Sequence, residues 1–242
     1  MTYGAVLWKD FIVFKSKFIS NTLAAIVGPL LYLIAFGWGI GDAIAVNGQS
    51  YVSFVIPGIA AMNSMSISFG VIATNLNISR LYDKTFEAEM TSPLRPLVFT
   101  LAKITVGVLR GLYTAMLILL VSMLFDRSLV ITPYLIILFV LNCAVFSTIG
   151  IIVGLLIKSH ADMSRVTNFI ITPMSFLCGT LFPLERFPSV LRYAFEYLPL
   201  TQAVSVLRQG AMSAGSWVAP VVLAIWFIVL IPVAVKVCTS AE

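Results

Sequence analysis

Residues 51–76 read YVSFVIPGIAAMNSMSISFGVIATNL, a run without a single Asp, Glu, Lys or Arg. A helix rises about 1.5 Å per residue and the hydrocarbon core of a bilayer is about 30 Å thick, so about 20 apolar residues cross it. The run therefore predicts a membrane-spanning helix. Similar runs recur along the chain, and we predict an all-α integral membrane protein with six spans, at residues 22–40, 51–76, 98–125, 133–157, 166–182 and 218–237.

The composition excludes an ordinary soluble domain. Hydrophobic residues make up 60% of the 242 residues, charged residues make up 10%, and the mean hydropathy is +1.04. A soluble surface usually requires about 25% charged residues. The net charge of +5 is spread singly between apolar runs, which argues against a nucleic-acid partner. Cys143, Cys178 and Cys238 lie within or at the end of apolar runs without CxxC spacing, so we expect neither an obligatory disulfide nor a metal site.

The Lys and Arg residues predict the orientation, because they accumulate on the cytoplasmic side of a membrane. Assigning alternate connections to opposite sides places ten together: Lys9, Lys15, Lys17, Arg80, Lys84, Arg95, Lys103, Lys158, Arg165 and Lys236. The other side receives Arg127, Arg186, Arg192 and Arg208. We therefore expect a multi-pass protein of a bacterial inner membrane with both termini in the cytoplasm.

Residues 3–18 predict an amphipathic helix before the first span. Its apolar side chains recur at helical spacing, as Tyr3, Leu7, Phe11, Phe14 and Phe18. This pattern is typical of an interfacial helix on the cytoplasmic leaflet, although an extension of the first span is the alternative. Charged residues interrupt the segment, so we do not interpret it as a cleavable signal and expect the chain to be retained whole.

Residues 183–212 are too apolar for an ordinary loop, and prolines divide them into pieces too short to span. Pro183, Pro188 and Pro199 mark the divisions, and Phe187 lies in the first piece. Both pieces carry an apolar stripe. We predict an external re-entrant helical hairpin that shields the translocation path and shifts when substrate leaves; a static plug is the alternative.

The most polar connection, residues 79–96, reads SRLYDKTFEAEMTSPLRP. Asp83 is placed to cap a short helix, and Pro93 and Pro96 end it. Phe86 and Met90 lie four residues apart and are predicted to present an apolar pair to the groove of a partner. A short solvated loop helix is the alternative.

Catalytic motifs are missing from the sequence. His160 is the single histidine, and no GxxxxGK[ST] motif occurs. We therefore expect the chain to have no catalytic residues, no metal and no cofactor of its own. If ATP drives it, a partner subunit binds the ATP and Mg²⁺.

Several stretches resemble the type-2 ABC exporter permeases, especially the membrane subunits of nodulation-factor and daunorubicin-type drug exporters. They are DFIVFKSKFISNTLAAIVGPLLYLIAFGWGIG at 10–41, YVSFVIPGIAA at 51–61, KTFEAEMTSPLRP at 84–96, GTLFPLERFP at 179–188 and LPLTQAVSVLRQ at 198–209. The resemblance implies a homodimer, or a pair with a paralogous permease, joined to two copies of a nucleotide-binding ATPase subunit. It also implies a coupling helix, which here would comprise Asp83, Lys84, Thr85, Phe86, Glu87, Met90 and Thr91.

Two features inside the expected spans are candidates for a translocation path. Asn63, Ser66 and Gly70 recur at helical spacing, and hydrogen bonding between neighbouring helices is the alternative role. Arg110 lies inside the third expected span, where a charge costs about 2.5 kcal/mol or more unless it has a partner. It either snorkels to the cytoplasmic phosphates or lines a polar vestibule.

The sequence thus favours an ATP-driven permease that exports an amphipathic glycolipid, a lipo-oligosaccharide or a hydrophobic drug. An ion-driven secondary transporter would require an intramembrane acid or histidine relay, which the sequence lacks. A lipid-modifying membrane enzyme would require a nucleophile and a base together.

Overall fold

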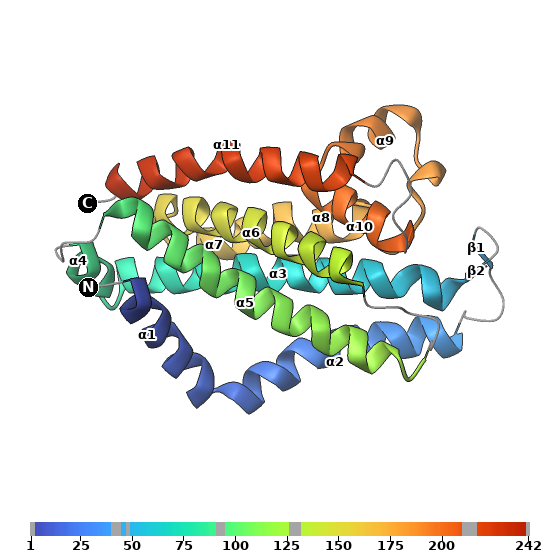
Figure 1. The fold of residues 1–242 in the computed structure, drawn as a ribbon, viewed down its shortest axis with the longest axis horizontal. Coiled ribbons are helices and arrows are strands. Elements are labelled where there is room, and N and C mark those ends of the chain that lie inside the picture. Colours follow the sequence, from blue (N-terminus) through green and yellow to red (C-terminus); the bar gives the residue numbers. More distant parts are fainter. Residues whose placement is uncertain are drawn as a thin grey trace.

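The computed structural model describes residues 3–39, 45–46, 49–90, 95–125, 132–209 and 217–240. Four long helices lie side by side along its longest axis: α3 (Tyr51–Leu81), α5 (Pro96–Ser122), α6 (Pro133–Leu156) and α11 (Val218–Ser240) (Figure 1). With α2 (Phe18–Gly39), they are the five helices within the described segments that are long and apolar enough to cross a membrane. The predicted all-helical fold is confirmed.

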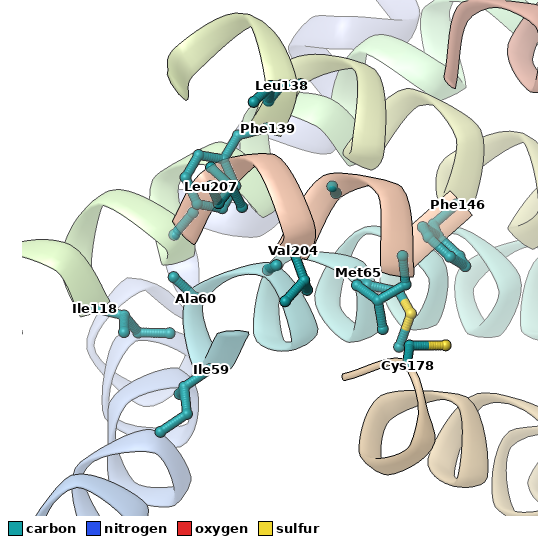
Figure 2. Close-up of a cluster of buried hydrophobic side chains, with 14 of the residues drawn as sticks. Ile59, Ala60, Met65, Ile118, Leu138, Phe139, Phe146, Cys178, Val204 and Leu207 are labelled. Atoms are coloured by element: carbon teal, nitrogen blue, oxygen red, sulfur yellow. The ribbon is translucent and has the colours of Figure 1, made fainter. Parts of the chain in front are cut away.

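Helix α3 forms the centre of the bundle, with α5 and α6 packed against it. Figure 2 shows part of the core, where α3 contributes Ile59, Ala60 and Met65 and α6 contributes Phe139 and Phe146. These side chains are almost fully buried. The uncharged run that begins at residue 51 is therefore buried mainly against other helices of the same chain.

Glycines allow α5 and α6 to approach their neighbours closely. A Cβ added at Gly107 would lie 2.1 Å from the Ser147 Oγ, and one added at Gly150 would lie 2.8 Å from the Phe69 carbonyl oxygen. Gly111 and Gly154, which form GxxxG pairs with Gly107 and Gly150, are also crowded by other residues of this chain. Both motifs therefore pack helices within one subunit.

The amino-terminal region consists of two helices that meet at an angle. Helix α1 (Tyr3–Ser16) is separated from α2 by one residue, Lys17. The two helices form a V (Figure 1). The separation agrees with a distinct helix before the first span rather than a continuous extension of it. Residue 40, the expected end of that span, lies outside the described residues.

The segment expected to form the fifth span is interrupted. It comprises α7 (His160–Val166), a π-helical turn (Thr167–Ile171) and α8 (Thr172–Leu177), and Gly179 follows with a φ of +76°. The Thr172 N–H donates to the Thr167 carbonyl five residues back. Pro173 has no N–H to continue regular bonding, and this supports the wide turn. Helical structure ends at Leu177, before the expected boundary at residue 182.

The short elements lie at opposite ends of the bundle. Helix α4 (Thr85–Met90) lies at the same end as the start of α1 and the end of α11 (Figure 1). The other end carries a 3₁₀ turn (Leu184–Arg186), α9 (Ser189–Glu196), α10 (Pro199–Gln209) and the antiparallel pair β1 (Ala45–Val46) and β2 (Gln49–Ser50). Residues 210–212 of the expected hairpin lie outside the described residues.

Candidate functional site

A tight turn holds α4 against the end of α3. Lys84 adopts a φ of +51°, which is uncommon for a residue with a side chain and reverses the chain direction here. The end of α3 is tied down because the Asn77 Nδ2 donates to the Ile157 carbonyl at 3.0 Å, and Arg80 donates to the Leu155 carbonyl. The end of α3 that leads into α4 is therefore bonded to the end of α6.

Phe86 does not project from α4 as the sequence predicted. Its side chain is only 1% exposed and packs edge to face on Phe99 of α5, with ring centroids 5.9 Å apart. The prediction that Phe86 presents an apolar side chain to a partner is therefore wrong, because Phe86 anchors α4 to the bundle. Burial of an aromatic ring against α5 stabilises the fold more than exposure on a polar loop would.

Two ion pairs join α1 to α4 and α5. The Lys9 Nζ lies 2.5 Å from the Glu89 Oε1, and the Lys103 Nζ lies 2.8 Å from the Asp10 Oδ2. The second pair is buried, with side chains about 10% exposed or less. The Lys103 ammonium also lies 5.6 Å from the centroid of the Phe99 ring. We call these contacts the junction, which comprises Lys9, Asp10, Phe86, Glu89, Phe99 and Lys103.

The remaining side chains of the α4 region face outward. Thr85 is half-buried, and the exposed residues form a polar surface at the end of the bundle: Tyr82, Asp83, Lys84, Glu87 and Ala88. Met90 belongs to α4, but its side chain and Thr91 lie outside the described residues. The exposed surface is therefore polar, and it differs in character from the apolar pair that the sequence suggested.

The polar residues of α3 divide between two faces. Ser64, Ser68 and Asn77 are buried in the bundle, where they hydrogen-bond to the backbone. The predicted path residues Asn63, Ser66 and Gly70 share a half-buried face with Ile67, Val71 and Thr74. The Asn63 Nδ2 donates to the Ala25 carbonyl of α2 at 3.3 Å, so this residue also contributes to helix packing.

Arg110 lies between α5 and α1, two turns beyond Lys103. Its Nη2 donates to the Asp10 carbonyl at 3.2 Å, and its guanidinium lies 5.0 Å from the centroid of the Phe14 ring. It does not lie on the half-buried face of α3 with Asn63. The two groups of predicted path residues are therefore separate, although Arg110 lines a small cavity of about 130 Å³ together with Ile67 and Val71 of α3.

The predicted hairpin residues divide into a packed helix and an exposed one. Pro188 precedes α9, Pro199 begins α10, and Pro183 precedes the 3₁₀ turn. The Phe187 ring packs on Phe195 of α9. Helix α9 has no buried residue, whereas Val204 and Leu207 of α10 point into the core (Figure 2). Most of α10 is therefore part of the bundle.

Arg208 fixes α10 in place. Its Nε and Nη2 donate to the carbonyls of Phe54 and Thr180 at 3.0 and 2.7 Å, and its guanidinium lies 3.5 Å from the centroid of the Phe54 ring. Burial lowers the pKa of the Arg208 guanidinium, and the negative charge of Glu185 partly offsets this. The group remains charged at neutral pH, and the two carbonyls compensate its desolvation.

Sequence reasoning missed the junction and the role of Arg208. Asp10 is the single acidic residue of residues 3–18 and Lys103 lies in an apolar run, which was the available signal that they pair. Within the described segments, His, Cys, Asp and Glu side chains form no group of three that could hold a metal ion. The arrangement provides a polar surface at one end of the bundle and a half-buried polar face on α3.

Comparison with known proteins gives consistent matches along most of the chain. The family described as ABC-2 type transporter matches residues 1–212. The inner membrane transport permease YadH of Escherichia coli (strain K12) is 25% identical over 207 residues, covering 84% of this chain and 80% of YadH. Nodulation protein J of Rhizobium leguminosarum bv. trifolii is 26% identical over 219 residues, covering 86% and 80%. The same-named protein of Rhizobium meliloti (strain 1021) is 26% identical over 212 residues, covering 84% and 79%.

Proposed function

We infer the function from one premise: this chain belongs to the ABC-2 type transporter family and is a membrane permease subunit rather than a catalytic one. We propose that it exports an amphipathic substrate across a bacterial inner membrane, using ATP that a separate ATPase subunit hydrolyses with Mg²⁺. The observation that carries the proposal is α4, a short helix with a polar exposed surface at one end of the bundle.

The proposed orientation places α4 and both termini in the cytoplasm. The start of α1, α4 and the end of α11 lie at one end of the bundle, and ten Lys and Arg residues fall on this side of the predicted topology (Figure 1). This arrangement requires six membrane crossings, and the five long helices supply five of them. We assign the remaining crossing to residues 160–182 around the π-helical turn. Residues 183–212 then lie outside, with α9 exposed and α10 packed in the bundle.

The junction contains the contacts through which we propose that movement of the ATPase subunit is transmitted to the membrane-spanning helices. A movement of α4 pulls on α1 through the Lys9–Glu89 pair and on α5 through the Phe86–Phe99 contact. Helix α1 is in turn fixed to α5 by the Asp10–Lys103 pair. Because the three helices are linked in pairs, we propose that they move as a unit when nucleotide binds or is hydrolysed.

The proposed path follows the half-buried face of α3 that contains Asn63, Ser66 and Gly70, with Arg110 at its border. A single subunit leaves this face partly uncovered, so we propose that a second copy, or a paralogous permease, completes the path. The mixture of polar and apolar side chains suits a glycolipid, a lipo-oligosaccharide or a hydrophobic drug better than a small ion.

The outward surface of α4 provides the test of ATPase coupling. Glu87→Arg together with Ala88→Arg changes two exposed residues without disturbing Phe86 or Glu89. We expect the double variant to fold normally but to lose most co-purification of the ATPase subunit and most transport. Arg192→Glu, an exposed charge reversal on α9, is the matched control. Normal ATPase co-purification and transport by the α4 variant would contradict the proposed coupling role.

Gly70 provides the test of the path. A Cβ added there meets nothing within 4 Å, and the same is true of Gly28 on α2, so both glycines accept a larger side chain within the subunit. We expect Gly70→Phe to reduce transport at least tenfold with little change in thermal stability. Gly28→Phe should transport at close to the normal rate. Equal transport by the two variants would remove the α3 face from the path.

A further inference from the structure

Helices α1 and α5 touch near both ends of α1, and Asp10 of α1 also contacts α5 between these two points. At one point, the hydroxyl oxygens of Tyr3 and Thr105 lie 2.7 Å apart. At the other, the Phe14 and Tyr113 rings meet edge to face, with centroids 5.5 Å apart. Between these points lies a cavity of about 570 Å³, which we call the α1–α5 groove; its walls include Leu7, Trp8, Phe11, Val106, Leu109 and Arg110.

The groove is apolar apart from one cation. Trp8, Phe11 and Leu109 are 64%, 53% and 59% exposed, so the apolar walls remain open in the isolated chain. Asp10 also borders the groove, but its carboxylate pairs with Lys103. Among the described residues, no carboxylate forms an ion pair with Arg110. The Asp10 carboxylate attracts both Lys103 and Arg110, so these three groups together carry one net positive charge beside the groove, and the planar donors of Arg110 suit a phosphate.

Neighbouring residues place the groove near the level of the lipid headgroups. Lys15 and Lys17 are exposed and follow Phe14, the residue whose ring contacts Arg110. Lysine ammonium groups at a membrane extend to the headgroup region. Trp8 on the groove wall is also a residue type enriched at that level. An occupant at this depth must combine an apolar chain with an anionic group, as a membrane phospholipid does.

The occupant of the groove is separated from the proposed path. Phe14, Arg110 and Tyr113 line both the groove and the smaller cavity beside Ile67 of α3, so the two spaces adjoin, but Asn63 and Ser66 line neither of them. A molecule in the groove thus contacts the outer surface of α1 and α5 without reaching Asn63 or Ser66. This geometry suits a resident lipid rather than a molecule in transit.

We propose that the α1–α5 groove binds an anionic phospholipid of the surrounding leaflet, with its phosphate on Arg110 and the proximal part of one acyl chain against Leu7, Phe11 and Leu109. Such a lipid covers apolar walls that would otherwise meet mobile bulk lipid. It also supplies a phosphate for a guanidinium whose nearest carboxylate, Asp10, is ion-paired with Lys103. Helix α1 is then held to α5 by the lipid as well as by the junction.

Quenching of Trp8 by brominated lipids tests the proposal. The full-length protein is reconstituted in phosphatidylcholine vesicles that contain either brominated phosphatidylglycerol or brominated phosphatidylcholine. The Trp8 signal is the component of the fluorescence that Trp8→Phe removes. We expect the phosphatidylglycerol to quench this component with about fivefold higher apparent affinity, the factor that one cation near a membrane surface provides.

Variants of Arg110 distinguish lipid binding in the groove from general attraction of the anionic lipid to other cations of the protein. Arg110→Gln should reduce the preference to less than twofold, and Arg110→Lys should retain part of it. Lys15→Gln, an exposed cation outside the groove, should retain at least threefold. Leu7→Asn should weaken quenching by both lipids, because it removes apolar wall rather than charge.

Three results would overturn the proposal. Equal quenching by the two lipids would mean that the groove holds bulk lipid without selection, and an unchanged preference in Arg110→Gln would assign the selection to other cations. Quenching by neither lipid would mean that a protein segment covers the groove. The measurement needs neither ATPase nor substrate, so failure here leaves the transport proposal intact, and failure of transport leaves the lipid site intact.

Discussion

The short helices at the two ends of the bundle are held by different kinds of interaction. Helix α4 and the helix α1 beside it are tied to the spans by the ion pairs Lys9–Glu89 and Asp10–Lys103, with Phe86 as the apolar anchor. Helix α10 is held by a buried apolar face that includes Leu200, Val204 and Leu207. Its single cation, Arg208, bonds to two backbone carbonyls rather than to a carboxylate.

The difference indicates where the molecule can move. The Lys9–Glu89 pair is exposed only on its Lys9 side and joins α1 to α4 at the end of the bundle, so the two helices can move together there. Close apolar packing has few alternative arrangements, and hydrogen bonds to fixed backbone carbonyls restrict α10 further. We therefore expect α4 and α1 to move during transport while α10 stays with the bundle. If part of the external segment moves, we expect it to be α9, which has no buried residue.

The largest effect is expected from breaking the buried pair at the α4 end. Asp10→Leu leaves the Lys103 ammonium buried without its carboxylate, and such a loss costs about 3–5 kcal/mol. We expect a clearly lower midpoint of thermal unfolding for the detergent-solubilised protein. The double variant Asp10→Leu, Lys103→Met removes both charges and should recover most of the loss. An Asp10→Leu variant as stable as the parent would show that the pair is not buried.

The next largest effect is expected at the other end. Arg208→Gln removes the charge-assisted hydrogen bonds to Phe54 and Thr180, and a hydrogen bond to a charged group contributes about 1.5–3 kcal/mol. We expect a lower unfolding midpoint and easier proteolysis of the segment around α10. Arg192→Gln, at an exposed position on α9, should change neither measurement. Equal behaviour of the two variants would mean that Arg208 does not hold α10.

The long helices could be predicted from the sequence because the length and apolarity of a segment determine whether it can span a membrane. Four expected spans begin within two residues of observed helices, at Tyr51, Pro96, Pro133 and Val218. Prolines at or near the starts of α5, α6, α9, α10 and α11 fit first-turn positions, where the missing N–H has no helical partner. The interrupted segment around Thr167 was not predicted, because a π-helical turn depends on local hydrogen bonding that the hydropathy pattern does not record.

The candidate sites were harder to predict because they depend on which helix faces meet. Phe86 has the same spacing from Met90 whether it faces a partner or the core, and only the contact with Phe99 decides between them. Asp10 and Lys103 are 93 residues apart, so no local pattern joins them. In contrast, the unusual polarity of α3 was visible in the sequence, and the structure divides it into a buried face and a half-buried one.

The smallest effect is expected from Lys9, and it provides a test of the contrast between a partly exposed pair and a buried one. The Glu89 side chain is buried, but the Lys9 side chain is 45% exposed and Gln can still donate a hydrogen bond, so Lys9→Gln should cost about 1 kcal/mol or less and lower the unfolding midpoint by about 2–4 °C at most. In about 1 M NaCl the Debye length falls to about 3 Å, so this small difference from the parent should disappear. The larger loss in Asp10→Leu should persist in the same salt, because buried charges are screened much less. If high salt removed both differences, the two pairs would be equally accessible to solvent, and the α4 end would hold by surface electrostatics alone.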